Sequence, residues 1–202
     1  MSATAKTQKT SKLCRSFGKA AAFANLSEIY WNGEGAKPAA PNKAGPGSKK
    51  PVMIKCSDYE NQIDKIVEIV SDNKGLNIGI LTNHQNLRNI YGPLSEQLDG
   101  EVEVQMYKSL TRERELDFNK PGVKVLSFGT MKGLEFDLVI ITRFEKINAT
   151  GDKATDLNRA YVAITRACNE LYIMYFGKEC VPPKWADVMS PLLENDDLVE
   201  WK

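Results

Sequence analysis

The side chains that most often bind metals or attack substrates are sparse and scattered in this sequence. Cys14, Cys56, Cys168 and Cys180 form no C-x-x-C pair, and His84 is the only histidine. The ligand spacings of a zinc site cannot be assembled from them, so no metal site is predicted. We expect four reduced cysteines that pack as small hydrophobic side chains.

Two stretches contain the other residues that could take part in binding or catalysis. They are VKVLSFGTMKGLEFDLVIITRF, residues 123–144, and NRAYVAITRACNELYIMY, residues 158–175. Arg166 in the second stretch has a permanently charged, planar guanidinium, which suits the negative charge that spreads over phosphoryl oxygens during transfer. From residue identity alone, an arginine that interacts with the dipole at a helix C-terminus is the simpler interpretation. Gly133 in the first stretch permits close approach of the backbone to a ligand.

The elements that must position these residues follow from the hydrophobic pattern. Short apolar runs alternate with amphipathic segments, which indicates strands alternating with helices. The predicted strands are 52–55, 77–81, 101–107, 123–127, 138–142 and 170–176, and the predicted helices are 57–72, 85–98 and 156–168. This order is typical of an α/β fold, a parallel sheet with helices on both faces. Ligands of such sheets collect at the carboxyl ends of the strands, so we expect the chemistry in the loops after Leu81, Ser127 and Thr142.

The first 51 residues differ from the rest in composition. Residues 1–12 are rich in Ser, Thr and Lys and predict a disordered tail, and 13–31 predict an amphipathic helix that leads into the domain. Residues 32–51 are rich in proline, glycine and lysine, which predicts a flexible linker. Residues 52–202 are then the folded domain, because a chain of 202 residues with 42% hydrophobic side chains suffices for one core.

Bulk charge points to no particular partner. The chain has 27 Lys and Arg against 26 Asp and Glu, so any contact with nucleic acid must come from a local basic face. No stretch approaches the roughly 20 apolar residues that span a bilayer, and the start has no apolar signal segment. We expect a cytoplasmic protein without membrane contact.

Two motifs carry a family resemblance. Residues 132–136, KGLEF, match the core of motif V in UvrD-, Rep- and PcrA-like superfamily 1 DNA helicases. Residues 161–167, YVAITRA, match their motif VI almost letter for letter. More weakly, residues 13–31 resemble the N-Y-R-S segment that leads into this domain, and residues 77–94 resemble a strand-loop-helix segment with the pattern I-L-x-R-x-N-x-Q. The chain therefore resembles the C-terminal RecA-like domain, motifs IV to VI, of these helicases.

The resemblance implies a three-layer RecA-like sheet and roles for individual residues. Arg166 would be the arginine finger for ATP hydrolysis, and Arg159 would assist it, although a solvated or ion-paired Arg159 is the simpler interpretation. Glu135 would bind the ribose, Gly133 would lie beneath the nucleotide, and Lys132 would add positive field. A water-exposed loop carboxylate is the alternative for Glu135. ATP and Mg²⁺ would be shared with a partner domain that supplies the metal ligands.

The resemblance also implies that single-stranded DNA runs over the carboxyl ends of the strands, contacted by polar side chains and backbone amides. Candidates after one strand are Thr82, Asn83 and His84, and candidates after another are Ser127 and Thr130. Asn83 and Ser127 could equally cap a helix or form a turn. His84 also suits a solvated loop.

The sequence departs from the family at several places. It contains no phosphate-binding loop G-x-x-x-x-G-K-[ST], and the Asp-Glu pair that would hold magnesium is also missing. Relatives place both in a first RecA-like domain. The segment between Tyr107 and Val123 is too short for the large accessory insertion of UvrD and Rep. Gly18 stands where relatives have a phosphate-contacting arginine, and Gly129 stands where they usually have histidine.

Three hypotheses are consistent with this sequence. In the first, the chain is a C-terminal motor module that needs a separate phosphate-loop domain, as a fragment or a split subunit, and hydrolyses no ATP alone. In the second, it is a non-catalytic module that binds DNA or docks onto a helicase partner. In the third, it is a truncated product without a function of its own.

Overall fold

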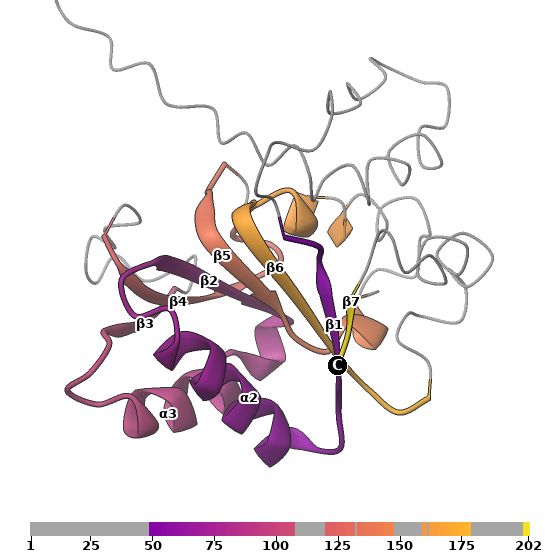
Figure 1. Ribbon diagram of the computed structural model, residues 1–202, viewed down its shortest axis with the longest axis horizontal. Coiled ribbons are helices and arrows are strands. Elements are labelled where there is room, and N and C mark those ends of the chain that lie inside the picture. The colour runs from indigo at the N-terminus through magenta and orange to yellow at the C-terminus, as the bar shows by residue number, and fades with distance from the viewer. Residues whose placement is uncertain (1–48, 108–119, 132, 148–158, 161, 179–199) are drawn as a thin grey trace, which may run out of the picture.

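Seven parallel strands form one twisted sheet (Figure 1). The computed structural model describes residues 49–107, 120–131, 133–147, 159–160, 162–178 and 200–202. The strands are β1 Val52–Cys56, β2 Asn77–Thr82, β3 Val104–Met106, β4 Gly122–Ser127, β5 Phe136–Ile141, β6 Ala167–Phe176 and β7 Glu200–Trp201. Their order in the sheet is β3-β4-β2-β5-β6-β1-β7, and every pairing is parallel. The carboxyl ends of all these strands therefore lie along one edge of the sheet.

Helices cover both faces of the sheet, which confirms the predicted three-layer α/β fold. Helix α2, Tyr59–Ser71, joins β1 to β2, and the short 3-10 turn η1, His84–Asn86, leads into α3, Leu87–Gln97. Both helices pack on one face through a shared apolar cluster (Figure 1). The helical residues 159–160 and 162–164 contribute to a second apolar cluster on the opposite face. The sheet is thus buried from both sides, as continuous apolar strands require.

Helix α2 begins where its sequence provides a cap. The Asp58 carboxylate accepts a hydrogen bond from the Asn61 amide at 2.9 Å, and the Asn61 side chain accepts one from the Ser57 amide at 3.2 Å. These bonds satisfy amides that the first turn of a helix leaves unpaired. The Asn61 amide and then the Ser57 hydroxyl lower the pKa of Asp58, because both stabilise its charged form. The predicted inner face, which includes Ile63, Ile66 and Val70, is buried.

Strands β2 and β5 approach closely through a glycine. A Cβ atom on Gly79 would lie 2.5 Å from Cδ2 of Phe136, so the aromatic ring occupies the space that any other residue would fill. Phe136 is 1% exposed and is among the largest fully buried side chains of the described residues. Gly79 therefore serves packing at the centre of the sheet.

Several predicted boundaries are wrong. Strand β3 has three residues where seven were predicted, because residues 99–102 form turns and a bend and pairing starts only at Val104. Strand β6 starts at Ala167, three residues earlier than predicted, so the preceding helix ends before Arg166 and does not reach Cys168. Strand β7 was not predicted at all. The predicted tail and helix, residues 1–31, and most of the predicted linker lie outside the described residues.

The cysteines differ from the expectation of four reduced thiols. Cys56 is free and buried at the end of β1. Cys168 is disulfide-bonded, which contradicts the prediction for that residue. Cys14 and Cys180 lie outside the described residues. Among the helices that the structure describes, none is long and apolar enough to cross a membrane.

Candidate functional site

The parallel sheet separates the candidate residues into two groups on opposite edges. Asn83 and Ser127 lie at the carboxyl ends of β2 and β4, where the loops were expected to carry the chemistry. Glu135 and Arg166 instead directly precede Phe136 and Ala167, the first residues of β5 and β6. The residues that the resemblance implies for the nucleotide thus lie at the amino edge, and Glu135 among them belongs to the loop after Ser127, one of the loops expected to carry the chemistry.

Arg166 joins the two sequence motifs at the amino edge. Its backbone carbonyl accepts a hydrogen bond from the Phe136 amide at 3.0 Å, and Phe136 pairs with Ala167 in register. Its half-buried guanidinium donates from Nη1 to the Leu134 carbonyl at 3.1 Å and from Nε to the Val162 carbonyl at 3.0 Å. These contacts hold the guanidinium between the KGLEF and YVAITRA segments.

Thr165 completes this arrangement. The Nη2 atom of Arg166 donates to the Thr165 hydroxyl at 3.2 Å, and that hydroxyl donates to the Val162 carbonyl at 3.0 Å. Arg166 lies in the turn after the helical residues, so it does not share a helix face with Arg159. Arg159 itself is half-buried within the helical residues.

Gly133 and Glu135 form an open surface beside Arg166. Gly133 has a φ of +83°, a conformation that favours glycine, and a Cβ atom there would meet nothing within 4 Å. Glu135 is exposed, and its carbonyl accepts a long hydrogen bond of 3.5 Å from the Asn77 side chain. Lys132 lies outside the described residues. Free space, a backbone conformation that favours glycine and an exposed carboxylate are thus grouped at this edge.

Asp137 is a residue of this edge that sequence reasoning missed. Its carboxylate accepts a hydrogen bond from the Asn77 amide at 3.0 Å and so ties the start of β2 to β5. The signal available in the sequence was an acidic residue inside an otherwise apolar strand.

The carboxyl edge is organised by β2 and β4, which are neighbours. Thr82 pairs with Ser127 in register, and the Thr82 carbonyl accepts a hydrogen bond from the Phe128 amide at 3.1 Å. Thr82 is fully buried, and its hydroxyl has no hydrogen-bond partner among the residues that the structure describes, so this side chain faces the interior. Thr130 donates from its amide and its hydroxyl to the Ser127 carbonyl at 2.9 and 3.0 Å. Ser127 and Thr130 therefore form a turn, with their hydroxyls 3.3 Å apart.

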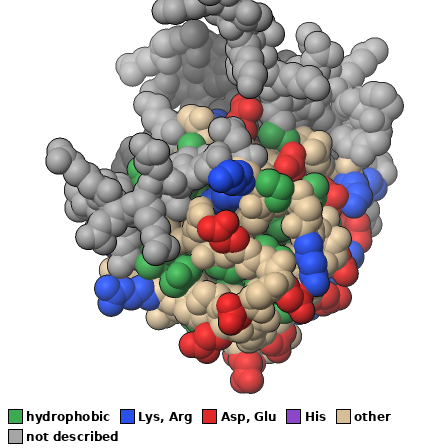
Figure 2. All heavy atoms as spheres, turned by 90° about the vertical axis from the view of Figure 1, so that its left-hand side faces the viewer, with side chains coloured by type: hydrophobic (Ala, Val, Ile, Leu, Met, Phe, Trp, Pro, Cys, Tyr) green, Lys and Arg blue, Asp and Glu red, His purple; other side chains and the backbone are tan. Residues whose placement is uncertain are grey.

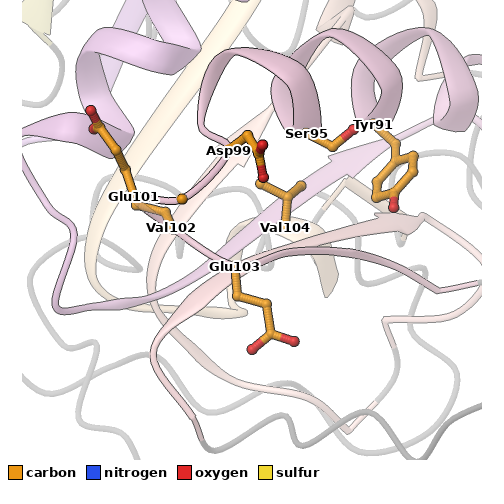
Figure 3. A pocket seen from close by; sticks show the side chains of 8 residues that line it. Tyr91, Ser95, Asp99, Glu101, Val102, Glu103 and Val104 are labelled. Carbon is orange, nitrogen blue, oxygen red and sulfur yellow. The ribbon is translucent and has the colours of Figure 1, made fainter.

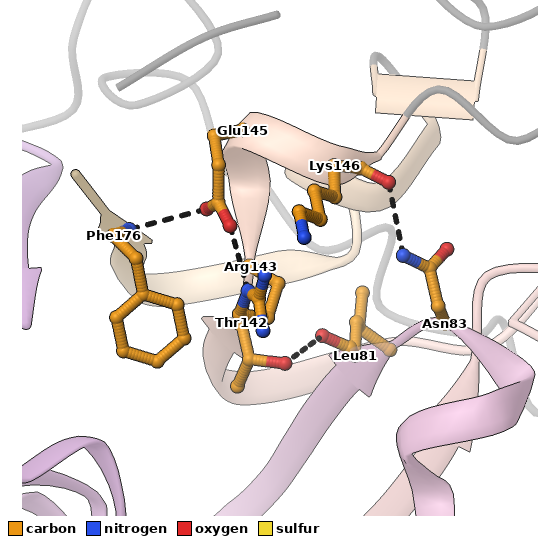
Figure 4. Close-up of polar contacts among 7 residues, drawn as sticks. All are labelled: Leu81, Asn83, Thr142, Arg143, Glu145, Lys146 and Phe176. Atoms are coloured by element: carbon orange, nitrogen blue, oxygen red, sulfur yellow. Dashed lines mark hydrogen bonds and ion pairs between the residues drawn. The ribbon is translucent and has the colours of Figure 1, made fainter. Parts of the chain in front are cut away.

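Asn83 links the loop after β2 to the loop after β5. Its side-chain nitrogen donates to the Lys146 carbonyl at 2.9 Å (Figure 4). His84 is exposed at the start of η1. Gly129 is also exposed, and a Cβ atom there would meet only the Ser127 hydroxyl oxygen at 3.8 Å. Neither space nor a left-handed backbone requires glycine at position 129.

The loop after β5 contains polar residues that sequence reasoning located only as a loop. Arg143 has a φ of 54° and is the one non-glycine residue with positive φ among those described. Its Nε donates to Oε1 of Glu145 at 2.6 Å, and Oε2 of Glu145 accepts from the Phe176 amide at 3.2 Å. The guanidinium carbon lies 4.5 Å from the ring centroid of Phe176 and 5.5 Å from that of Tyr59. Lys146 follows in the 3-10 turn η2, Phe144–Lys146 (Figure 4).

An acidic hollow of about 500 Å³ lies apart from both groups. It is lined by Tyr91 and Ser95 from α3 and by Asp99, Glu101 and Glu103 before β3 (Figure 3). On the same side of the molecule, acidic side chains gather at the lower end, where α2 and α3 lie, and the described hydrophobic side chains form only small separate groups (Figure 2). None of the candidate residues lines this hollow. Its carboxylates would repel a phosphate backbone.

A parallel sheet between two helical layers, with the KGLEF and YVAITRA segments joined at its amino edge, defines the class of RecA-like α/β domains. The chain belongs to the UvrD-like helicase C-terminal domain family, whose sequence profile matches residues 5–178. This match confirms the resemblance drawn from the two motifs and makes the chain a helicase C-terminal module.

The fold agrees with that of a solved helicase domain. The C-terminal domain of a possible DNA helicase from Lactobacillus plantarum WCFS1 aligns with a TM-score of 0.61 at 18% identity, covering 92% of this chain and 98% of that one. The C-terminal domain of the DEAD-box protein Dbp5 aligns with a TM-score of 0.48 at 14% identity, covering 78% of this chain and 91% of that one. A search of curated proteins finds no match.

Proposed function

We propose that this helicase module forms half of an ATP-driven motor for single-stranded DNA and that a separate phosphate-loop domain supplies the other half. The observation that carries the proposal is the pairing of Arg166 with the Glu135 segment across the start of β5 and β6. A guanidinium held at a domain surface can stabilise the charge that develops on a transferred phosphoryl group. Glu135 and Gly133 beside it would receive the ribose and the nucleotide.

The open surface at Gly133 and Glu135 leaves room for a nucleotide that is bound between this chain and a second domain. Gly133 leaves open space, and Glu135 is exposed rather than committed to an ion pair in the described structure. Among the described residues, no group of three or more His, Cys, Asp or Glu side chains gathers to hold a metal. In this proposal, Mg²⁺ is therefore bound by the phosphate-loop domain, where it neutralises phosphate charge.

The carboxyl edge would carry the nucleic acid. Asn83, His84, Ser127 and Thr130 present side chains or backbone at the ends of β2 and β4, and short polar groups of this kind contact phosphates in other complexes. Thr82, which is buried, would shape the edge from beneath. Nucleotide and DNA would then bind at opposite edges of the same rigid sheet. Closure of the two domains around the nucleotide at one edge would therefore move the DNA-binding residues at the other edge.

A second candidate function is a non-catalytic module that binds DNA or docks onto a helicase. Two observations favour it. Arg166 already donates three hydrogen bonds within its own domain, and Gly129 replaces the histidine that relatives usually carry. Such a module would keep the carboxyl-edge surface without using the amino edge for catalysis.

The two functions differ in what Arg166 contributes. The chain should be purified with the phosphate-loop protein that copurifies from its host, and the DNA-stimulated ATPase of the complex measured. For the motor, Arg166→Lys lowers turnover by about a thousandfold or more, because an ammonium cannot replace the planar guanidinium. The control Arg88→Lys, at an exposed position on α3, should leave turnover unchanged.

The remaining outcomes separate the hypotheses further. An unchanged ATPase rate for Arg166→Lys would favour the binding module. Robust ATP hydrolysis by the purified chain alone would overturn the shared site, because it would require a phosphate-binding loop that the sequence lacks.

A further inference from the structure

The Tyr59, Arg143, Glu145 and Phe176 side chains form a cluster, here called the Arg143 clamp, at the carboxyl ends of β1, β5 and β6. Figure 4 shows Arg143, Glu145 and Phe176 of this cluster. Arg143 and Glu145 are only 14% and 12% exposed. The guanidinium is paired on its edge by the carboxylate and lies within cation–π distance of both aromatic rings, which are 5.6 Å apart. Four residues from three segments of the chain thus hold one loop.

The backbone of the loop is unusual in the same place. Arg143 adopts a left-handed conformation, which residues other than Gly, Asn and Asp rarely do. Such a conformation persists only when the surrounding contacts determine it, and it points to a role for the local geometry. Phe144 and Ile147 are fully buried in the apolar cluster on the opposite side and anchor the loop there.

The result of these constraints is an exposed Lys146. The clamp fixes one side of η2 and the buried Phe144 and Ile147 fix the other, so Lys146 is the residue of this turn that reaches solvent. Its carbonyl accepts the hydrogen bond from Asn83 that joins this loop to the end of β2. A cation is therefore held beside the polar residues of the carboxyl edge.

We infer that Lys146 binds a phosphate of single-stranded DNA and that the Arg143 clamp positions it. The inference rests on the proposed function and extends the DNA surface from β2 and β4 to the loop after β5. Arg143 itself is a positioning residue, because its guanidinium is committed to Glu145 and to the two rings.

The experiment measures binding of the full chain to a labelled oligothymidylate of about twenty nucleotides, long enough for several phosphate contacts, as a function of salt. Loss of one phosphate contact reduces the slope of log K against log salt by about 0.7, which corresponds to roughly fivefold weaker binding near 0.1 M salt. We expect this change for Lys146→Gln. The matched control Lys74→Gln removes the same charge just before β2, on the amino edge, and should leave the slope unchanged.

The positioning role is tested by a double-mutant cycle. Arg143→Asn removes the clamp while keeping a residue that tolerates the left-handed backbone. It should weaken binding several-fold on its own but add nothing to Lys146→Gln, because both changes remove the same contact. If Arg143→Asn does not fold, as judged by circular dichroism, Glu145→Gln weakens the same clamp with an isosteric side chain and should show the same lack of additivity.

The binding measurements distinguish failure of the Lys146 inference from failure of the proposed function. If the wild-type chain binds the oligonucleotide but Lys146→Gln keeps the full slope of log K against log salt, the inference is wrong and DNA binds at a surface that does not include Lys146. A further fall in slope when Arg143→Asn is added to Lys146→Gln would show a direct phosphate contact by Arg143 and overturn the positioning role. If neither the wild-type chain nor its complex with the phosphate-loop partner binds, the proposed function itself fails.

Discussion

Arg166 and Arg143 show how one residue type serves two purposes in this domain. Each guanidinium is held by neighbours, Arg166 by the carbonyls of Leu134 and Val162 and Arg143 by the carboxylate of Glu145. Leu134 and Val162 present backbone carbonyls to Arg166, whereas a carboxylate neutralises the charge of Arg143. At the residue scale, the ion pair with Glu145 marks Arg143 as a structural residue, and the proposed motor assigns the incoming phosphoryl group to Arg166.

Cys56 yields a prediction that involves no ligand. Its side chain is 1% exposed, and burial raises the pKa of the thiol from 9.0 to about 11. At pH 8, native Cys56 should therefore react with iodoacetamide roughly a hundredfold more slowly than in the unfolded chain, because the thiolate is the reactive form. Mass mapping of the peptide that contains Cys56, in native buffer and in denaturant, measures this ratio.

The same shift has a consequence for stability. Because the pKa of Cys56 is raised in the folded state, the unfolded thiol ionises first as the pH rises. The contribution of Cys56 to the free energy of unfolding is therefore complete below pH 9 and is lost as the pH rises from 9 toward about 11. Fast labelling of native Cys56 at pH 8 would show instead that the end of β1 opens readily.

At the scale of elements, Gly79 lets β2 and β5 pack against the ring of Phe136. Gly79→Ala places a methyl group 2.5 Å from that ring, so it should lower the free energy of unfolding by about 1–3 kcal/mol. Gly92→Ala is the matched control, because a Cβ at this position on α3 meets nothing within 4 Å. It should change the free energy of unfolding by less than about 0.5 kcal/mol, because the gain in helix propensity is offset by crowding of the new Cβ against Pro93. Urea denaturation measures both changes, and equal effects would contradict the close packing.

The elements also show what could be predicted from the sequence. Strands β2, β4 and β5 are mostly apolar and buried, each has a strand neighbour on both sides, and such apolar segments are visible in a linear pattern. Strand β3 pairs only with β4, so its register depends on a neighbour rather than on its own residues. The start of β6 was missed because ACNE, residues 167–170, continues a helical pattern, and pairing with Phe136 overrides it.

The candidate site divides in the same way. Arg166 and Glu135 could be proposed from the sequence because each lies in a contiguous motif. The Arg143 clamp could not be found, because it joins residues 59, 143, 145 and 176 through contacts that only the folded sheet creates. The assignment of the nucleotide candidates to the amino edge also required the fold. The motifs alone do not show at which edge of the sheet their residues lie.

At the scale of the whole molecule, the proposed motor places its two ligands on opposite edges of one sheet, which predicts two separable activities. In the complex with a phosphate-loop partner, Lys146→Gln should raise the DNA concentration needed for half-maximal ATPase stimulation by roughly fivefold, the loss of one phosphate contact. The maximal rate should stay unchanged, because the amino edge is intact. Arg166→Lys should lower the maximal rate without changing DNA affinity.

Each variant is expected to change only one of the two parameters because the sheet keeps its two edges apart. Lys146 follows the carboxyl end of β5, whereas Arg166 precedes the amino end of β6, its immediate neighbour, so the full length of the strands separates them. Titrating oligothymidylate against ATPase rate and fitting both parameters tests the arrangement, with Lys74→Gln as the charge control. A variant at one edge that changed both parameters equally would mean that ATP and DNA share a single surface, and the sheet could then not transmit closure from one ligand to the other.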